Sequence, residues 1–251
     1  MSRAAILVLL SILALGAVAI GQYAAQAHAT VSSAEAILTY PISLPTPTMG
    51  GAPAPAPALA SVGTVPLAPP AILASWQVLD TPASLSGEGG RWVERQGHIA
   101  QDGLNPAASL SAAETALLSP DIYDNIAISA SYYDEGNGTV GLIARHSDRG
   151  FYRVRLHTDP TFDGEALMLE KVVDGVALPL VSNHGEPLYQ RHSWHTLTLS
   201  FQDGQITVTL DDQIVAQVVD AAPLPAGRVG LYARALGGMF FDQVTLAGKE
   251  L

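Results

Sequence analysis

From Ala74 to the C-terminus, hydrophobic and polar residues alternate with a period of two rather than 3.6. In the segment 125–133, every second residue is Ile, Ala or Tyr, and the residues between them are small or polar. The segments 140–145 and 152–157 repeat this alternation, and a period of two places successive side chains on opposite faces of a strand. The pattern predicts strands with one face toward a core, formed by Ile126, Ile128, Ala130, Tyr132, Val140, Leu142, Ala144, Tyr152, Val154 and Leu156.

Short turn signals separate the alternating segments in the second half of the chain. Asp174-Gly175 and Asp203-Gly204 each lie between two alternating runs, where a two-residue hairpin turn needs positive φ at both positions. Asp211-Asp212 precedes a further run at 213–219. We expect about twelve short strands, no helix beyond the N-terminus, and an all-β fold, a two-sheet antiparallel β-sandwich.

The N-terminal segment has the pattern of an export signal. Arg3 is followed by 17 residues, 4–20, without a charge, and Ala27-His28-Ala29 matches the small-x-small pattern of a signal-peptidase site. The apolar stretch is longer than most signal cores and shorter than most membrane spans. Residues 1–29 are therefore interpreted as an apolar helix that is either a cleaved signal peptide or a membrane anchor, which places the rest of the chain outside the cytoplasm, secreted or anchored.

A Pro/Ala-rich linker follows, over residues 30–73. Nine prolines lie between Pro41 and Pro70, and proline fixes φ and lacks the N–H of a helix or ladder. This stretch predicts a semi-rigid spacer. The folded domain is expected over residues 74–251.

Charge and cysteine content exclude several functions. The formal net charge is −11, and 22 acidic against 11 basic side chains lie beyond residue 75. Nucleic-acid binding needs clustered Lys and Arg and is excluded, and no polybasic run for anionic lipid exists, so contact with a membrane is expected only through the N-terminal segment. The absence of cysteine excludes disulfides and thiolate chemistry.

Several motifs follow one another in a fixed order along the folded region: Trp76, 92–93, 97–99, 141–145, 150–156, 169–175, 194–197, 206–212, 227–232 and 241–244. This order resembles the concanavalin A-like lectin/glucanase superfamily, including laminin-G-like jelly rolls and, distantly, 3-keto-disaccharide hydrolases. Asp212 stands where a glycine is usual in one turn of that family. The resemblance implies a jelly roll whose members include hydrolases, lectins and adhesion modules, so the fold does not decide the function.

No catalytic residues are predicted. Family-16 glycoside hydrolases carry Glu-x-Asp-x-x-Glu on one strand, and this string is absent; Asp163, Glu165 and Glu170 come nearest with the wrong spacing. A carboxylate pair from two different strands remains an alternative.

An arginine-rich strand face is the candidate ligand site. Arg153 and Arg155 share one face of a strand, Phe151 and His157 extend it, and Arg145 has the matching phase on the preceding strand. Guanidinium groups beside an aromatic ring suit carboxylate- or sulfate-bearing sugars. The alternative is cross-strand ion pairing with the abundant Asp and Glu side chains. The predicted ligand-binding residues are Arg145, Phe151, Arg153, Arg155 and Tyr232, with Arg234 a weaker addition.

No cofactor is expected, although two acidic loops offer oxygen ligands of the kind that Ca²⁺ takes. They are residues 134–138 and the group Asp159, Asp163 and Glu165. His192 and His195 lack metal-ligand spacing and are assigned structural roles, and Trp76, Trp92 and Trp194 are expected in the core.

The leading hypothesis is an exported or membrane-tethered, non-catalytic binding or interaction module with a glycan or protein partner at the cell surface. The alternatives are a glycoside hydrolase of the 3-keto-disaccharide type and an accessory structural subunit of an envelope or membrane complex.

Overall fold

A computed structural model describes residues 65–80, 91–102, 113–136, 138–158, 165–235 and 238–251. One short helix, α2 (Pro69–Ser75), and fifteen strands make up this part of the chain. The strands are β1 (Val65–Leu67), β2 (Gln77–Asp80), β3 (Arg91–Arg95), β4 (His98–Asp102), β5 (Ala113–Leu118), β6 (Tyr123–Asp134), β7 (Thr139–Ser147), β8 (Gly150–His157), β9 (Leu167–Val173), β10 (Val176–Asn183), β11 (Trp194–Gln202), β12 (Gln205–Leu210), β13 (Gln213–Val219), β14 (Arg228–Ala235) and β15 (Met239–Glu250).

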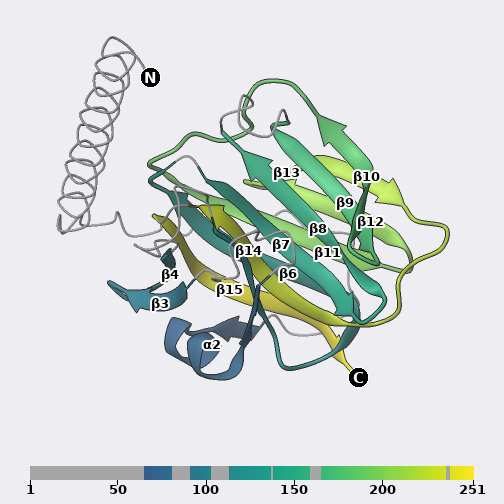
Figure 1. Cartoon of the computed structure of the whole chain (residues 1–251), viewed down its shortest axis with the longest axis horizontal. Coiled ribbons are helices and arrows are strands. Elements are labelled where there is room, and N and C mark those ends of the chain that lie inside the picture. Colours follow the sequence, from purple (N-terminus) through teal and green to yellow (C-terminus); the bar gives the residue numbers. More distant parts are fainter. Residues whose placement is uncertain (1–64, 81–90, 103–112, 137, 159–164, 236–237) are drawn as a thin grey trace, which may run out of the picture. The chain divides into compact units, whose positions relative to one another are not determined.

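The strands form two antiparallel sheets that pack as a sandwich (Figure 1). The eight-stranded sheet has the order β13-β12-β11-β6-β15-β4-β3, with β1 paired to β15. The seven-stranded sheet has the order β10-β9-β8-β7-β14-β5-β2. The predicted fold class, a two-sheet antiparallel sandwich, is confirmed.

The core lies between the two sheets and contains the residues that the alternation predicts. Ile126, Ile128 and Tyr132 of β6 and Leu142 and Val154 of the opposite sheet are fully buried in one hydrophobic cluster. Burying apolar surface at about 25 cal/mol per Å² is the main force that holds the two sheets together. The alternation in each strand therefore determines which residues face the core and which face outward, where a ligand can bind.

The Asp-containing turns have the backbone that the hairpins require. Both residues of Asp174-Gly175, Asp203-Gly204 and Asp211-Asp212 have positive φ, and the flanking strands pair directly across each turn. Asp212 holds φ at 66° without glycine. Asp tolerates this region better than most residues, so the departure from the usual motif leaves the turn intact.

The described fold begins before the expected domain start at residue 74. β1 pairs with β15, and α2 buries Ile72 in the core, although β1 and most of α2 fall in the range that the sequence assigns to the linker. Pro69 and Pro70 occupy the first turn of α2, where a missing N–H costs nothing. Prolines that suggested a spacer here start a helix, which lies beside β3 and β4 (Figure 1).

No helix among the described residues is long and apolar enough to span a bilayer. The proposed signal or anchor, residues 1–29, and the linker as far as residue 64 lie outside the described residues.

Candidate functional site

The candidate site lies on the outer face of the seven-stranded sheet, the face turned away from the core. Strand β8 places Arg153 and Arg155 on this face because Tyr152, Val154 and Leu156 take the inner positions. In the register, Arg153 lies opposite Glu170 of β9, and Arg155 lies opposite Gly141 of β7. The predicted pairing of the two arginines on one face is confirmed.

Both arginines are held by the same carboxylate. Arg153 Nε donates a hydrogen bond of 2.6 Å to Glu170 Oε1 and its Nη2 pairs with the same oxygen. Arg155 Nε lies 3.2 Å from Oε1, and its Nη2 donates to Oε2 at 3.4 Å. Glu170 is 2% exposed and Arg153 8%. The expected alternative, an ion-paired arginine face, is therefore present at these two residues, with the difference that Glu170 and Arg153 are buried and only Arg155 is partly exposed.

Aromatic rings complete the lower layer of the site. The Arg153 guanidinium lies 4.7 Å from the centre of the Tyr232 ring and 5.9 Å from that of Phe151, within cation–π range. Tyr232 is fully buried in a small outer-face cluster, and Phe151 packs against that cluster from the half-exposed edge. Tyr232 is thus a support beneath Arg153, and Phe151 is the ring that a ligand can reach.

Gly141 makes the space for this layer. A Cβ at Gly141 would collide with the Val154 carbonyl oxygen and lie 2.9 Å from Tyr232 Cδ1. Only glycine lets the Tyr232 ring lie against the neighbouring strand at this point.

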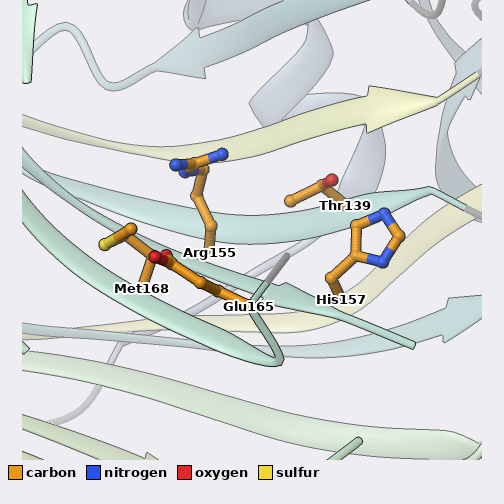
Figure 2. Close-up of a pocket in the computed structure, with 5 residues that line it drawn as sticks. All are labelled: Thr139, Arg155, His157, Glu165 and Met168. Carbon is orange, nitrogen blue, oxygen red and sulfur yellow. The ribbon is translucent and has the colours of Figure 1, made fainter. Parts of the chain in front are cut away.

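A small pocket opens beside Arg155 (Figure 2). Its lining comes from β7, β8 and the start of β9, and its volume of about 10 Å³ has room for about one water molecule. The Thr139 hydroxyl is buried and has no hydrogen-bond partner among the described residues. The lining residues are Thr139, Arg155, His157, Glu165 and Met168.

The lining residues offer both donors and acceptors. Glu165 lies 3.7 Å from exposed His184, and Arg155 brings a guanidinium whose side chain is 19% exposed, against 10% for Arg153. Arg155 is therefore the arginine that solvent reaches. His157 extends this face, as its position in the strand predicts; Thr139 and Met168 were not predicted, although their outward phase follows from the alternation of β7 and β9.

Arg145 does not belong to this face, which corrects the expectation from its phase. The β7–β8 register shifts between Ala144 and Ser147, and Arg145 takes positive φ, 54°, within this bulge. An extra residue in a bulge reverses the alternation locally. The guanidinium turns to the sandwich interior, 3.9 Å from the centre of the Phe201 ring.

The Arg145 guanidinium binds other groups of the fold. It binds the Asp124 carboxylate, the Asp124 carbonyl oxygen and the Leu224 carbonyl oxygen. Burial lowers the pKa of Arg145, and the nearby Asp124 opposes that change. Arg145 caps one end of the core, away from the outer face.

Trp194 is also placed differently from the prediction. Trp76 and Trp92 are buried in the core as expected, whereas Trp194 is half-buried outside it. Its ring lies 5.1 Å from that of His98 and 5.6 Å from that of Tyr133. Trp194 is the first residue of β11. Leu197 and Leu199 have the inward phase of this strand, and Trp194, an odd number of residues before them, has the outward phase.

His195 occupies a Ser–His–Asp arrangement that is structural. Its Nδ1 lies 2.6 Å from Asp211 Oδ2, and its Nε2 lies 2.9 Å from Ser193 Oγ. The Gln190 carbonyl oxygen also lies 2.9 Å from Nε2 and accepts a bond from Ser193 Oγ. A carbonyl in this position directs the serine proton away from the imidazole, so the group ties the start of β11 to the β12–β13 turn.

In the first acidic loop, residues 134–138, the Asp134 carboxylate is bound by other groups of the fold. Asp134 is 1% exposed; its Oδ1 accepts the Gly136 N–H at 2.9 Å and its Oδ2 accepts the Tyr189 hydroxyl at 3.1 Å. Burial raises the pKa of Asp134 to about 6. Asp159 and Asp163 of the second loop lie outside the described residues, and no group of three metal-ligating side chains occurs in the described part of the chain.

Comparison with known proteins shows a fold and no close sequence relative. No family model and no curated protein matches the sequence. The carbohydrate-binding module CBM66 from Bacillus subtilis superimposes with a TM-score of 0.53 at 15% identity, over 69% of this chain and 96% of the module. A Bacillus subtilis protein of unknown function with a galectin-like fold gives 0.54 at 11% identity, over 69% of this chain and 89% of that one.

A third structure, described as a native glycosidic hydrolase, gives a TM-score of 0.51 at 9% identity, over 75% of this chain and 97% of the hydrolase. Proteins that bind sugars and proteins that cleave them thus share this architecture. The chain has the concanavalin A-like jelly-roll fold that its ordered strand motifs predicted.

Proposed function

We propose that this domain is a non-catalytic glycan-binding module that works outside the cytoplasm. The observation that carries the proposal is the convergence of Arg155, Thr139 and His157 on one pocket in the outer face of the seven-stranded sheet. The fold adds support, because a carbohydrate-binding module of Bacillus subtilis has the same architecture along 96% of its length.

The donor and acceptor set favours sugar hydroxyls. Glu170 already binds both guanidiniums from beside the pocket, and Glu165 supplies a carboxylate to the pocket wall itself, so the site has an acceptor as well as donors. Where an arginine lies beside a carboxylate, the guanidinium can donate to one hydroxyl of a sugar while the carboxylate accepts from the neighbouring hydroxyl. We therefore narrow the expected ligand from acidic sugars to neutral ones.

The pocket dimensions set how the sugar binds. A volume of about 10 Å³ admits a single hydroxyl and not a ring. The ring itself lies over the sheet surface beside the pocket; half-exposed Phe151 lies four residues from Arg155 along β8, on the far side of Arg153, and is too distant to stack on the same sugar. Such a shallow site binds a terminal or side-chain sugar and relies on few contacts.

Export is part of the same proposal. The uncharged segment 4–20 behind Arg3 and the Ala27-His28-Ala29 pattern support delivery across a membrane, after which the domain is secreted or tethered. Glycans at a cell surface are then the accessible partners.

Binding is favoured over hydrolysis by the state of the carboxylates. Glycoside cleavage needs two carboxyl groups on either side of the scissile bond, one of them available as a proton donor. On this face Glu170 is fixed between two guanidiniums and is almost without exposure. It is poorly suited to act as an acid or a nucleophile.

A glycan array followed by calorimetry tests the proposal. Wild-type domain is expected to bind a neutral glycan, and Arg155→Ala and Thr139→Val are expected to weaken it about tenfold or more, which is about 1.4 kcal/mol. Arg149→Ala, an exposed arginine of the β7–β8 turn, is the charge-matched control and should bind as wild type.

Three results would contradict the proposal. If no glycan binds, the accessory-subunit alternative is favoured; if Arg155→Ala binds equally well, the site is elsewhere. Release of cleaved sugar, detected by mass spectrometry, would identify a hydrolase.

A further inference from the structure

A cleft remote from the Arg155 pocket opens where α2 meets one end of the sandwich. Its volume is about 320 Å³, within the size range of small-molecule sites. The walls come from β1, the end of α2, the β5–β6 loop and the end of the β6–β15 strand pair.

The cleft is held by hydrogen bonds of the main chain. Tyr123 exchanges two backbone bonds with Gly227, and the Leu251 N–H donates to the Ile122 carbonyl oxygen at 3.0 Å. Ser119 Oγ accepts the Val229 N–H and donates to the Asp121 carbonyl oxygen. These bonds fix the β5–β6 loop before any ligand arrives, so little ordering cost accompanies binding.

Two aromatic side chains form the inner wall. Trp76 is 8% and Tyr123 7% exposed, and the indole N–H and the phenol hydroxyl have no hydrogen-bond partner among the described residues. The indole nitrogen and the phenol oxygen both retain some exposure, so solvent in the cleft reaches them. Leu67 and Leu246 extend the apolar surface beside the two rings.

The charges at the cleft have one sign. Asp121 is partly exposed and Glu250 exposed; neither carboxylate forms an ion pair with a described Lys, Arg or His, and the described lining contains no basic residue. Their joint effect is visible at Tyr123, where burial first, and then the charges of Asp121 and Glu250, raise the phenol pKa.

We propose that this cleft binds a small organic cation, an N-alkylated ammonium group. Aromatic faces attract a cation through their quadrupole, and the two carboxylates supply the counter-charge. An anion is repelled by both carboxylates. A bare primary ammonium needs several acceptors to replace its water, whereas an alkylated one exposes carbon to the Leu67, Leu246 and Pro120 surface.

This site is independent of the proposed glycan pocket. It shares no lining residue with the Arg155 pocket, and no sequence motif indicates it, since its members come from four separate segments. Failure of either proposal leaves the other standing.

Choline chloride is the probe, and 3,3-dimethyl-1-butanol, the uncharged molecule of the same shape, is its control. Each is titrated into the full-length protein while the indole N–H resonance of Trp76, identified by its loss in Trp76→Phe, is followed by NMR. Choline is expected to shift this resonance saturably and to bind at least tenfold more tightly than the alcohol. Added salt should weaken choline binding.

The Asp121→Asn/Glu250→Gln variant should bind choline at least tenfold more weakly. Its charge-matched control is Asp174→Asn/Asp212→Asn, which changes two exposed turn residues at positive φ, a conformation that asparagine accepts. The proposal is overturned if choline gives no saturable shift, if the alcohol binds equally well, or if the double variant retains full affinity. The first two comparisons use wild-type protein, and Trp76→Phe serves only to identify the resonance that they follow.

Discussion

Glu170→Gln tests whether the outer-face ion cluster is a structural unit of the fold. Glutamine keeps the shape of the side chain and removes its charge, so two guanidiniums lose their shared partner. Glu170 is 2% and Arg153 8% exposed, which means that water can replace the carboxylate only after rearrangement. The variant isolates the charge from the packing.

The expected loss is set by how buried each pair is. Removing one partner of a buried ion pair costs about 3–5 kcal/mol because a charge remains without compensation. The Arg155 side chain is 19% exposed and recovers part of its hydration, and the amide oxygen of the introduced glutamine still accepts one hydrogen bond. We expect unfolding to become easier by about 3 kcal/mol, the lower end of that range.

Urea unfolding measures this change. With an m value of about 2 kcal/mol/M, the midpoint should fall by about 1.5 M at unchanged m, in low and high salt alike, because buried pairs are weakly screened. Glu186→Gln, an exposed glutamate, is the control and should stay within about 0.5 kcal/mol of wild type. A loss below about 1 kcal/mol for Glu170→Gln would refute the argument and return both arginines to the ligand surface.

Three further changes test other parts of the structure. Burial raises the pKa of Asp134 to about 6, so the contribution of the protonated side chain to stability is complete below about pH 4 and is lost as the pH rises through 6. In urea melts, the stability of wild type relative to Asp134→Asn should therefore fall by about 3 kcal/mol between about pH 4 and pH 7.5. Arg145→Lys should lower the melting temperature by about 4–8 °C, equivalent to about 2 kcal/mol, while exposed Arg149→Lys leaves it unchanged. Gly141→Ala should cost more than about 2 kcal/mol in denaturant unfolding because its Cβ meets backbone, whereas Gly175→Ala, with open space and φ of 77°, should cost only about 1 kcal/mol of backbone strain.

The fold could be predicted because its signals are local. Alternation within β6, β7 and β8 assigned the inner face, and Asp-Gly pairs assigned the hairpins. The β1–α2 segment was hidden because prolines at the start of a helix resemble those of a spacer when only composition is considered. A helix of seven residues has too few turns to display a 3.6-residue period.

The candidate site could be predicted only in part because it depends on register. Arg153 and Arg155 follow from one strand, but their partner Glu170 lies on β9, beyond a connection whose length in space the sequence does not give. Glu170 has the same outward phase as Met168, so its face could be inferred, although its position opposite Arg153 could not. The predicted face of Arg145 was wrong for another reason. A bulge adds one residue to the strand, and a face assigned from the alternation is reversed at that point.

The burial of the outer face determines where a ligand can bind. Tyr232 and Ile143 are fully buried there and Arg153 nearly so, so the middle of the face behaves as a second, smaller core rather than as an open platform. A ligand over the middle would have to separate Arg153 from Glu170 and from the Tyr232 ring, with a cost similar to that of breaking the ion cluster. At the Arg155 end the guanidinium is already partly hydrated, so a sugar hydroxyl there replaces water at little cost. Affinity is therefore expected to depend on Arg155 and the residues of its pocket, while substitutions of Arg153 and Tyr232 act on ligand binding through stability.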